Sequence, residues 1–267
     1  MVVIGLGSAG VGITKHFSDS HKKITIVESD FPKKCKTEED FEKYCPKFKK
    51  LKFTEDECWF FLCGGSKCSS AVLRTLQMIK NKKINIGYVF PDLDWASAHV
   101  AKRHKVIFNV LQEYVRSGLL NSITIFSNKD ILNIIGEQPI IEMYDMINKQ
   151  ISNTVETIQW FKSQEPVLGS SHKPQEISRI STVSMGNLKK DEENLMFLLD
   201  NITETGYIYS ISKQQLESNK NLLKLIKSRV SDDEKNKITS SFAVYPSEHK
   251  QSFFYSLKYT HHIQDWR

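Results

Sequence analysis

The amino-acid sequence predicts an α/β protein in which a mostly parallel sheet is covered by helices. Three observations lead to this fold class. Short apolar stretches of strand length alternate with longer stretches that carry apolar residues at helical spacing. Loops of small residues follow two of the apolar stretches, at 5–10 and at 63–70. The stretch at 139–163 then carries a nearly unbroken apolar stripe, which is typical of one long helix.

Together these features predict a Rossmann-like domain at 1–138, a central connecting helix at 139–163 and a smaller α/β C-terminal domain at 164–267. The first strand is predicted from the apolar residues at 2–4, and a helix follows to about residue 18. A second strand at 23–27 completes a βαβ unit. Residues 33–57 have weak periodicity and are predicted as short helices and loops. The other elements of this domain are predicted as strands at 58–62, 84–90 and 123–126 and as helices at 71–79 and 95–116.

The segment at 164–176 contains Pro166, Gly169 and Pro174, so it is predicted as the boundary before the second domain. A second series of elements follows it. These are predicted as strands at 180–185, 207–211, 238–245 and 253–259 and as helices at 191–202 and 214–230.

The composition is that of a folded protein, with 40% hydrophobic and 25% charged residues in a chain of 267. No apolar run approaches the roughly 20 residues that span a bilayer, so we expect a cytoplasmic protein without a membrane segment. The 5 cysteines are irregularly spaced, which favours reduced thiols and predicts no metal site built from them. The net charge of +6 comes largely from lysines with acidic neighbours and no interleaved aromatic residues. This pattern favours a solvated surface over direct nucleic-acid binding.

Gly5, Gly7 and Gly10 form a G-x-G-x-x-G pattern between a strand and a helix, and Ser8 and Ala9 lie inside it. Glycine at such a turn lets the backbone approach a phosphate, and the helix N-terminus offers free N–H groups and a positive dipole end. The alternative is that these glycines serve close packing alone. Because a second loop of similar chemistry follows, the pattern favours a nucleotide phosphate site.

That second loop consists of Gly64, Gly65, Ser66 and Lys67, again between a strand and a helix. In a parallel sheet both loops lie at the same edge, so they can hold one phosphate chain. Ser66 offers a hydroxyl group. Lys67 either places a cation near the terminal phosphates or is an exposed loop lysine.

Four segments resemble the tubulin/FtsZ family. Residues 4–10 are similar to its first phosphate loop, and residues 63–69 occupy the place of its glycine-rich second signature. Residues 122–132 resemble its strand and I-P-N-D-K-L segment, and residues 139–144 resemble the start of its central helix. The resemblance implies a guanine nucleotide, GTP or GDP, with Mg²⁺ as cofactor. It places Asn128 at the guanine-reading position and Tyr144 and Asn148 at the stacking and base-contacting positions, and it implies head-to-tail filaments.

The spacing of Tyr144 and Asn148 agrees with a base-binding role, because residues four apart share one helix face. The tyrosine ring can stack on a purine while the carboxamide bonds its edge. In the alternative interpretation Tyr144 is a core residue and Asn148 an ordinary polar helix position.

Two departures from the family limit the prediction of activity. The segment between the two phosphate loops is shorter than in FtsZ. The family's N-x-D-x-x-D motif after the central helix, which completes the neighbouring subunit's site, is absent between Phe161 and Ser181. Glu165 and Glu176 are the acidic residues there. The sequence therefore predicts weak or uncertain GTP hydrolysis and identifies no catalytic residue.

Two other functions remain open. Glu28 closes the second predicted strand, where an acidic residue can bind ribose hydroxyls, so an NAD- or FAD-dependent enzyme is the first alternative. The region beyond residue 170 shows no recognisable catalytic constellation for such an enzyme. The second alternative is a tubulin-like binding protein that does not polymerise.

Overall fold

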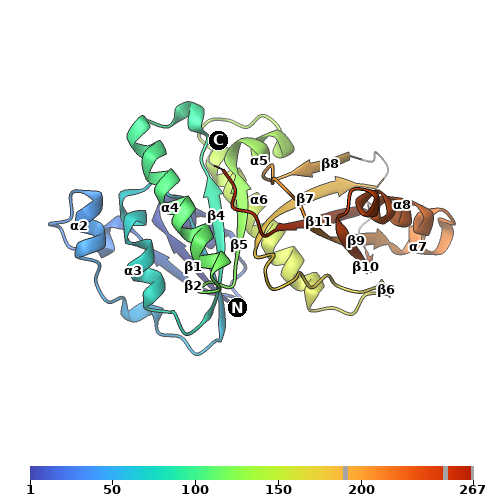
Figure 1. Cartoon of the computed structure of the whole chain (residues 1–267), viewed down its shortest axis with the longest axis horizontal. Coiled ribbons are helices and arrows are strands. Elements are labelled where there is room, and N and C mark those ends of the chain that lie inside the picture. Colours follow the sequence, from blue (N-terminus) through green and yellow to red (C-terminus); the bar gives the residue numbers. More distant parts are fainter. Residues whose placement is uncertain (189–191, 249–251, 266–267) are drawn as a thin grey trace. The chain divides into compact units, whose positions relative to one another are not determined.

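The computed structural model describes residues 1–188, 192–248 and 252–265. These residues form two compact units, Met1–Asn153 with the C-terminal residues from Ile263 on, and Thr154–His262 (Figure 1). The domain boundaries predicted at 138/139 and 163/164 remain predictions. The α/β fold class with a mostly parallel sheet in its first unit is confirmed.

The first unit is built on a parallel sheet with strand order β2-β1-β3-β4-β5. Strands buried on both faces read as continuous apolar runs, and the fully buried β1 is such a run. The five strands are β1 (Val2–Leu6), β2 (Lys22–Ile26), β3 (Glu57–Leu62), β4 (Lys83–Phe90) and β5 (Ser122–Ser127).

Helices connect these strands, and α1 packs on β1 and β3 while α4 packs against β5. Side-chain caps fix several helix starts, as at α4, where Ser97 accepts a hydrogen bond from the Val100 N–H. Gly118, at φ +80°, follows the end of α4. The helices are α1 (Gly7–His16), η1 (Glu28–Asp30), α2 (Glu38–Lys43), η2 (Lys49–Leu51), η3 (Lys67–Ala71), α3 (Val72–Gln77), η4 (Leu93–Trp95), α4 (Ala98–Arg116), α5 (Asn128–Ile135) and α6 (Met143–Lys162).

Two features of the first unit differ from the sequence prediction. The long helix α6 begins at Met143 instead of Pro139, because the Pro139 carbonyl closes a turn with the N–H groups of Glu142 and Met143. Ile140 and Ile141 are therefore 87% and 96% exposed and do not belong to the buried stripe. The short helix α5, which was not predicted, begins at Asn128 because the Ser127 hydroxyl accepts a hydrogen bond from the Asp130 N–H.

The chain returns to the first unit at its C-terminal end. The Gln112 carboxamide on α4 donates to the Gln264 carbonyl at 3.1 Å and accepts from the Gln264 N–H at 2.7 Å. Both residues are almost completely buried. This reciprocal pair attaches the last described segment to α4.

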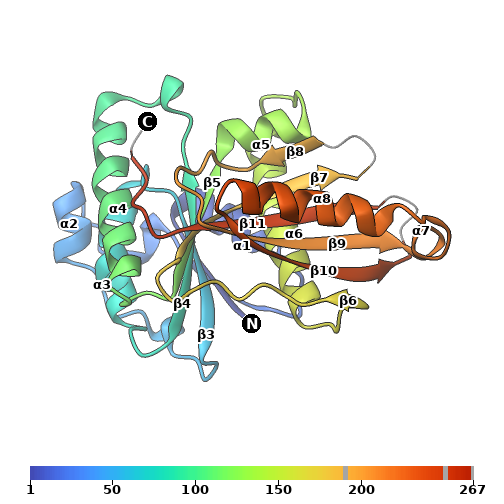
Figure 2. The same ribbon diagram turned by 45° about the vertical axis from the view of Figure 1, so that its right-hand side comes forward.

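The second unit contains a mixed sheet in which β7, β11, β9, β10 and β6 are neighbours in that order and β8 pairs with β7. The β9–β10 pair is parallel and the other pairs are antiparallel. Helix α8 packs on this sheet against β10 and runs along the direction of the strands (Figure 2). The elements are β6 (Leu168–Gly169), β7 (Ile180–Asn187), β8 (Glu192–Leu195), β9 (Glu204–Ser212), α7 (Lys213–Ser218), α8 (Leu222–Lys235), β10 (Thr239–Ser247) and β11 (Phe253–Thr260).

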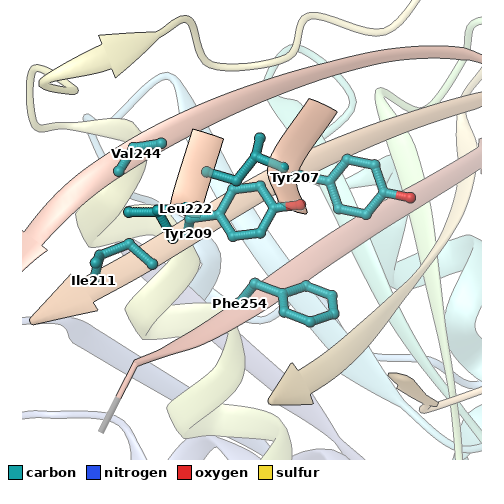
Figure 3. Close-up of a cluster of buried hydrophobic side chains, with 7 residues drawn as sticks. Tyr207, Tyr209, Ile211, Leu222, Val244 and Phe254 are labelled. Carbon is teal, nitrogen blue, oxygen red and sulfur yellow. The ribbon is translucent and has the colours of Figure 1, made fainter. Parts of the chain in front are cut away.

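Aromatic residues at alternate positions of the strands form the core beneath α8. Tyr207, Tyr209 and Ile211 of β9 point to the same face as Phe254, and Leu222 of α8 closes the cluster (Figure 3). The alternation follows from the two-residue period of a strand. The smaller C-terminal α/β unit predicted from the sequence is thus confirmed.

The helix predicted at 191–202 is wrong. Residues 192–195 form β8, which pairs antiparallel with β7, while residue 191 lies outside the described residues. The helix predicted at 214–230 is two helices, because the chain breaks at Asn219, which has extended backbone angles. In the described parts of the chain, no helix has the length and apolar character needed to cross a membrane.

Candidate functional site

The first loop joins β1 directly to α1, and its three glycines have different roles. Gly7 has φ +73°, a left-handed conformation that side chains rarely adopt, and it makes the sharp turn. A Cβ atom at Gly5 would lie 2.3 Å from the Gly10 carbonyl oxygen, and one at Gly10 would lie 2.2 Å from the Phe61 carbonyl oxygen. Gly5 and Gly10 therefore allow α1 to pack closely on the sheet.

The second loop contacts the first through Ser66. A Cβ atom on Gly7 would lie 3.1 Å from the Ser66 Cβ, so the two loops touch at the carboxyl edge of the sheet. Gly64 and Gly65 face the other way, because Cβ atoms there would lie 2.9 Å and 2.8 Å from the ring nitrogens of His104. Lys67 donates to the Lys36 carbonyl oxygen at 3.3 Å and does not line the pocket described next.

A pocket of about 360 Å³ lies beside the first loop. This volume is within the range of small-molecule sites. Its lining comes from five places in the first unit: the start of α1, the end of β3, the connection between β4 and α4, the start of α5 and the start of α6. The lining residues are Ser8, Ala9, Cys63, Pro91, Asp92, Ala96, Asn128, Tyr144 and Asn148.

The side of the pocket formed by α5 and α6 carries the residues predicted to read a base. Asn128 is the first residue of α5, and Tyr144 and Asn148 lie one turn apart on α6. Tyr144 is 57% exposed, so the core interpretation of this residue is wrong. An aromatic ring and two carboxamides therefore share one pocket with the first loop.

Contacts with α1 fix the start of α6. His16 lies 2.8 Å from the Asp145 carboxylate, and Asn148 packs directly on Gly12, where a Cβ atom would lie 2.4 Å from the Asn148 Nδ2. Gly12 was not singled out in the sequence analysis. It leaves the space that the Asn148 carboxamide occupies.

A buried hydrogen-bonded group supports the second loop from below. His104 Nδ1 lies 3.1 Å from the Tyr88 hydroxyl, and His104 Nε2 lies 3.5 Å from Cys63 Sγ. Burial lowers the pKa of His104 to about 4 and raises the pKa of Cys63 to about 11, so both are neutral at pH 7. A neutral thiol beside a neutral imidazole is not an activated nucleophile.

Sequence reasoning missed several pocket residues, namely Cys63, Pro91, Asp92 and Ala96. Pro91 and Asp92 directly follow β4, and the ends of parallel strands are where such sites form. That position is the signal that could have identified them. One oxygen of Asp92 caps η4 by accepting from the Asp94 N–H at 3.1 Å.

Not all predicted site residues come together in the pocket. Ser8, Ala9, Asn128, Tyr144 and Asn148 line it. The remaining predicted residues do not, and they lie in the two loops beside it: Gly5, Gly7, Gly10, Gly64, Gly65, Ser66 and Lys67.

Comparison with known proteins identifies the fold. No protein-family model matches the sequence, and no curated protein matches it. Among solved structures, an FtsZ dimer of M. jannaschii superposes with a TM-score of 0.69 at 10% identity, over 97% of this chain and 87% of that one. The chain has a tubulin/FtsZ-like fold.

Other tubulin/FtsZ-like structures agree. The GTPγS-form protofilament of Bacillus thuringiensis serovar israelensis TubZ matches with a TM-score of 0.69 at 10% identity, over 96% of this chain and 86% of that one. The GTPγS-bound protofilament of CetZ2 from Haloferax volcanii matches with a TM-score of 0.69 at 11% identity, over 96% of this chain and 92% of that one. The tubulin/FtsZ-like fold thus extends through both units of the chain.

Proposed function

We propose that the chain binds a guanine nucleotide, GTP or GDP with Mg²⁺, in the pocket beside the first loop. One observation carries the proposal. Asn128, Tyr144 and Asn148 lie far from the first loop in the sequence, yet they line one pocket with Ser8 and Ala9. That pocket belongs to a fold shared with structures described as GTPγS forms.

The base would lie between α5 and α6. The Tyr144 ring offers a stacking surface, and the Asn128 and Asn148 carboxamides each offer two donors and one acceptor oxygen. Guanine presents a carbonyl acceptor beside N–H donors, so a carboxamide can bond it in both directions. Adenine presents the reverse order, a 6-amino donor beside the N1 acceptor, so carboxamides held in the orientation that suits guanine are expected to bind adenine more weakly.

The phosphates would lie at the N-terminus of α1, where backbone N–H groups and the helix dipole favour an anion. The first turn of α1 contains no acidic residue that would oppose this charge. Among the described residues no cluster of His, Cys, Asp and Glu could hold a metal ion by itself. Mg²⁺ would therefore be held mainly by the phosphates, with Asp92 as the carboxylate of the pocket.

The pocket does not include Glu28, the residue on which the dinucleotide alternative rests. Glu28 lies in η1 after the edge strand β2, is exposed, and does not line the pocket. The residues that would bind a ribose in that enzyme are thus on the opposite side of β1 from Asn128 and Tyr144.

We further propose cytoplasmic head-to-tail filaments with slow GTP turnover. In such a filament the segment after α6 of one subunit would cover the nucleotide of the next, and this heterologous contact does not close. Glu165 and Glu176 are both exposed in that segment, without the paired acidic residues expected of efficient hydrolysis. FtsZ, TubZ and CetZ2 structures of the same fold include a dimer and protofilaments.

Calorimetry with GTP, ATP and NAD, each with Mg²⁺, tests the binding proposal. We expect GTP to bind and the other two to bind at least about tenfold more weakly, since a base mispaired with the two carboxamides loses hydrogen bonds. Asn128→Ala should weaken GTP binding by a similar factor, whereas Asn133→Ala, on the exposed side of the same helix α5, should not. Tight NAD binding without GTP binding would overturn the proposal.

Sedimentation and electron microscopy with and without GTP test the filament proposal. GTP-dependent pelleting of filaments is expected. A chain that binds GTP and stays monomeric at high concentration would instead be a tubulin-like binding protein that does not polymerise.

A further inference from the structure

The backbone N–H groups of the second loop are not equally available to a ligand. The Gly64 N–H faces the Tyr88 hydroxyl and lowers its pKa, and the Gly65 N–H does the same for the Cys63 thiol, although burial raises both pKa values overall. Within the described residues, the Ser66 N–H has no acceptor. Ser66 is also the residue that touches Gly7 of the first loop.

Arg103 of α4 holds the peptide group that carries this N–H. Its Nη1 donates to the Gly65 carbonyl oxygen at 2.5 Å, and its Nη2 forms an ion pair with the Glu38 carboxylate of α2. The Arg103 side chain is only 9% exposed, and His99 also bonds Glu38 at 3.0 Å. Both ends of the guanidinium fork are therefore fixed, one on the loop and one on α2.

The hydrogen bond from Arg103 to the Gly65 carbonyl also sets the direction of the Ser66 N–H, because both groups belong to one peptide unit. In a planar trans peptide the C=O and N–H bonds point in opposite directions. With the Gly65 oxygen drawn toward Arg103, the Ser66 N–H points away from α4. Gly7 of the first loop lies against the Ser66 side chain, so the proposed phosphate site at the start of α1 adjoins this residue.

We propose that Arg103 is a positioning residue of the phosphate site: by binding the Gly65 carbonyl it aims the Ser66 N–H at the phosphate chain, with Glu38 holding the guanidinium in place. The inference rests on the proposed nucleotide site and adds a residue that does not touch the ligand. It also gives α2 a role, because the helix in the segment of weak periodicity supplies the carboxylate that orients Arg103.

The test compares ligands with and without phosphates. Arg103→Lys keeps the charge but loses the planar fork that joins two partners, so it should release the Gly65 carbonyl. We expect the Kd of GTP and of GDP to rise roughly tenfold to a hundredfold, because a charge-assisted hydrogen bond and the aim of one N–H are lost. The Kd of guanosine, measured by displacement of a fluorescent GTP analogue, should change by less than about twofold, since the base contacts are untouched.

Two companion variants complete the design. Glu38→Gln leaves Arg103 in place with a weaker anchor and should give a smaller loss of GTP and GDP affinity in the same direction. Lys102→Ala removes the exposed neighbouring cation on α4 and should change neither ligand. In Arg103→Lys/Glu38→Gln the two losses should not add, because both variants act on one chain of contacts.

The outcomes separate the inference from the proposed function. Unchanged GTP affinity in Arg103→Lys overturns the inference, and so does an equal loss for guanosine, which would indicate general damage to the unit. If the wild-type chain binds ATP or NAD instead of GTP, the proposed function fails. The comparison of that nucleotide with its nucleoside then still tests Arg103.

Discussion

Replacing Gly12 by alanine should separate stability from ligand binding. Gly12 lies inside α1, and a Cβ atom there would stand 2.4 Å from the Asn148 Nδ2, against about 3.4 Å for an ordinary contact. The Asn148 carboxamide therefore has to move by about 1 Å, which it can do by rotating its flexible end. Alanine in a helix interior is more favourable than glycine by roughly 0.5–1 kcal/mol.

The expected result is opposite in sign for the two properties. The free energy of unfolding should stay the same or rise by up to about 1 kcal/mol, while GTP affinity should fall roughly tenfold, because the displaced carboxamide loses a hydrogen bond to the base. Urea unfolding and calorimetry on the same preparation measure both quantities.

The matched control compares Asn148→Ala with the double variant Gly12→Ala/Asn148→Ala. In that background Gly12→Ala should cause no further loss of affinity, since there is no carboxamide left to displace. If Gly12→Ala binds GTP as the wild type does, or if it loses stability and affinity together, the assignment of Asn148 to base contact is refuted.

Three other perturbations have defined outcomes. Gly10→Ala should destabilise the first unit by roughly 1–3 kcal/mol or more, because its Cβ meets the Phe61 carbonyl, and circular dichroism during urea unfolding measures this loss; a variant of wild-type stability would contradict the packing role. Since burial lowers the pKa of His104 from 6.5 to about 4, stability present above pH 6.5 should be lost as the pH falls toward 4, by roughly 3 kcal/mol. His104→Asn should flatten that part of the pH profile of unfolding, and an unchanged profile would refute the assignment. Glu165→Gln and Glu176→Gln should leave the slow phosphate release of GTP-grown filaments unchanged; a loss in either variant would identify a catalytic acid acting in trans.

Residues with strong local preferences were predicted well from the sequence. Gly7 at a strand end acts through its own backbone, so it marks a turn in any context. The helix predicted from residue 95 begins instead at Ala98, after the Ser97 cap. The strands of the first unit are continuous apolar runs because both faces of a parallel sheet are covered. These local signals were sufficient to predict the five strands of the first unit.

One error arises from a distant part of the chain and another from a local turn that outweighs the apolar period. Residues 192–195 are a strand because β7 lies beside them, and their short sequence contains no strand pattern of its own. Ile140 and Ile141 continue the apolar period of α6 in sequence, but the turn at Pro139 removes them from the helix.

The candidate site shows the same division. Asn128 and Tyr144 were found through a resemblance of segments, whereas Gly12 could be recognised only once Asn148 was seen packed upon it. The different roles of Gly5, Gly7 and Gly10 could likewise be assigned only once the positions of Phe61 and of the pocket were known. A glycine pattern predicts that some other group lies close to the backbone, and the structure identifies that group.

The reciprocal bond between Gln112 and Gln264 makes the first unit discontinuous along the chain. During synthesis the ribosome completes the second unit before the segment that covers Gln112 has been made. Until then α4 lacks the two hydrogen bonds that this segment supplies to Gln112, each of which contributes roughly 0.5–1.5 kcal/mol. The first unit can therefore reach its full stability only after Gln264 has been translated, and a fragment ending at residue 153 is expected to be less stable than the same unit with residues 263–265 present.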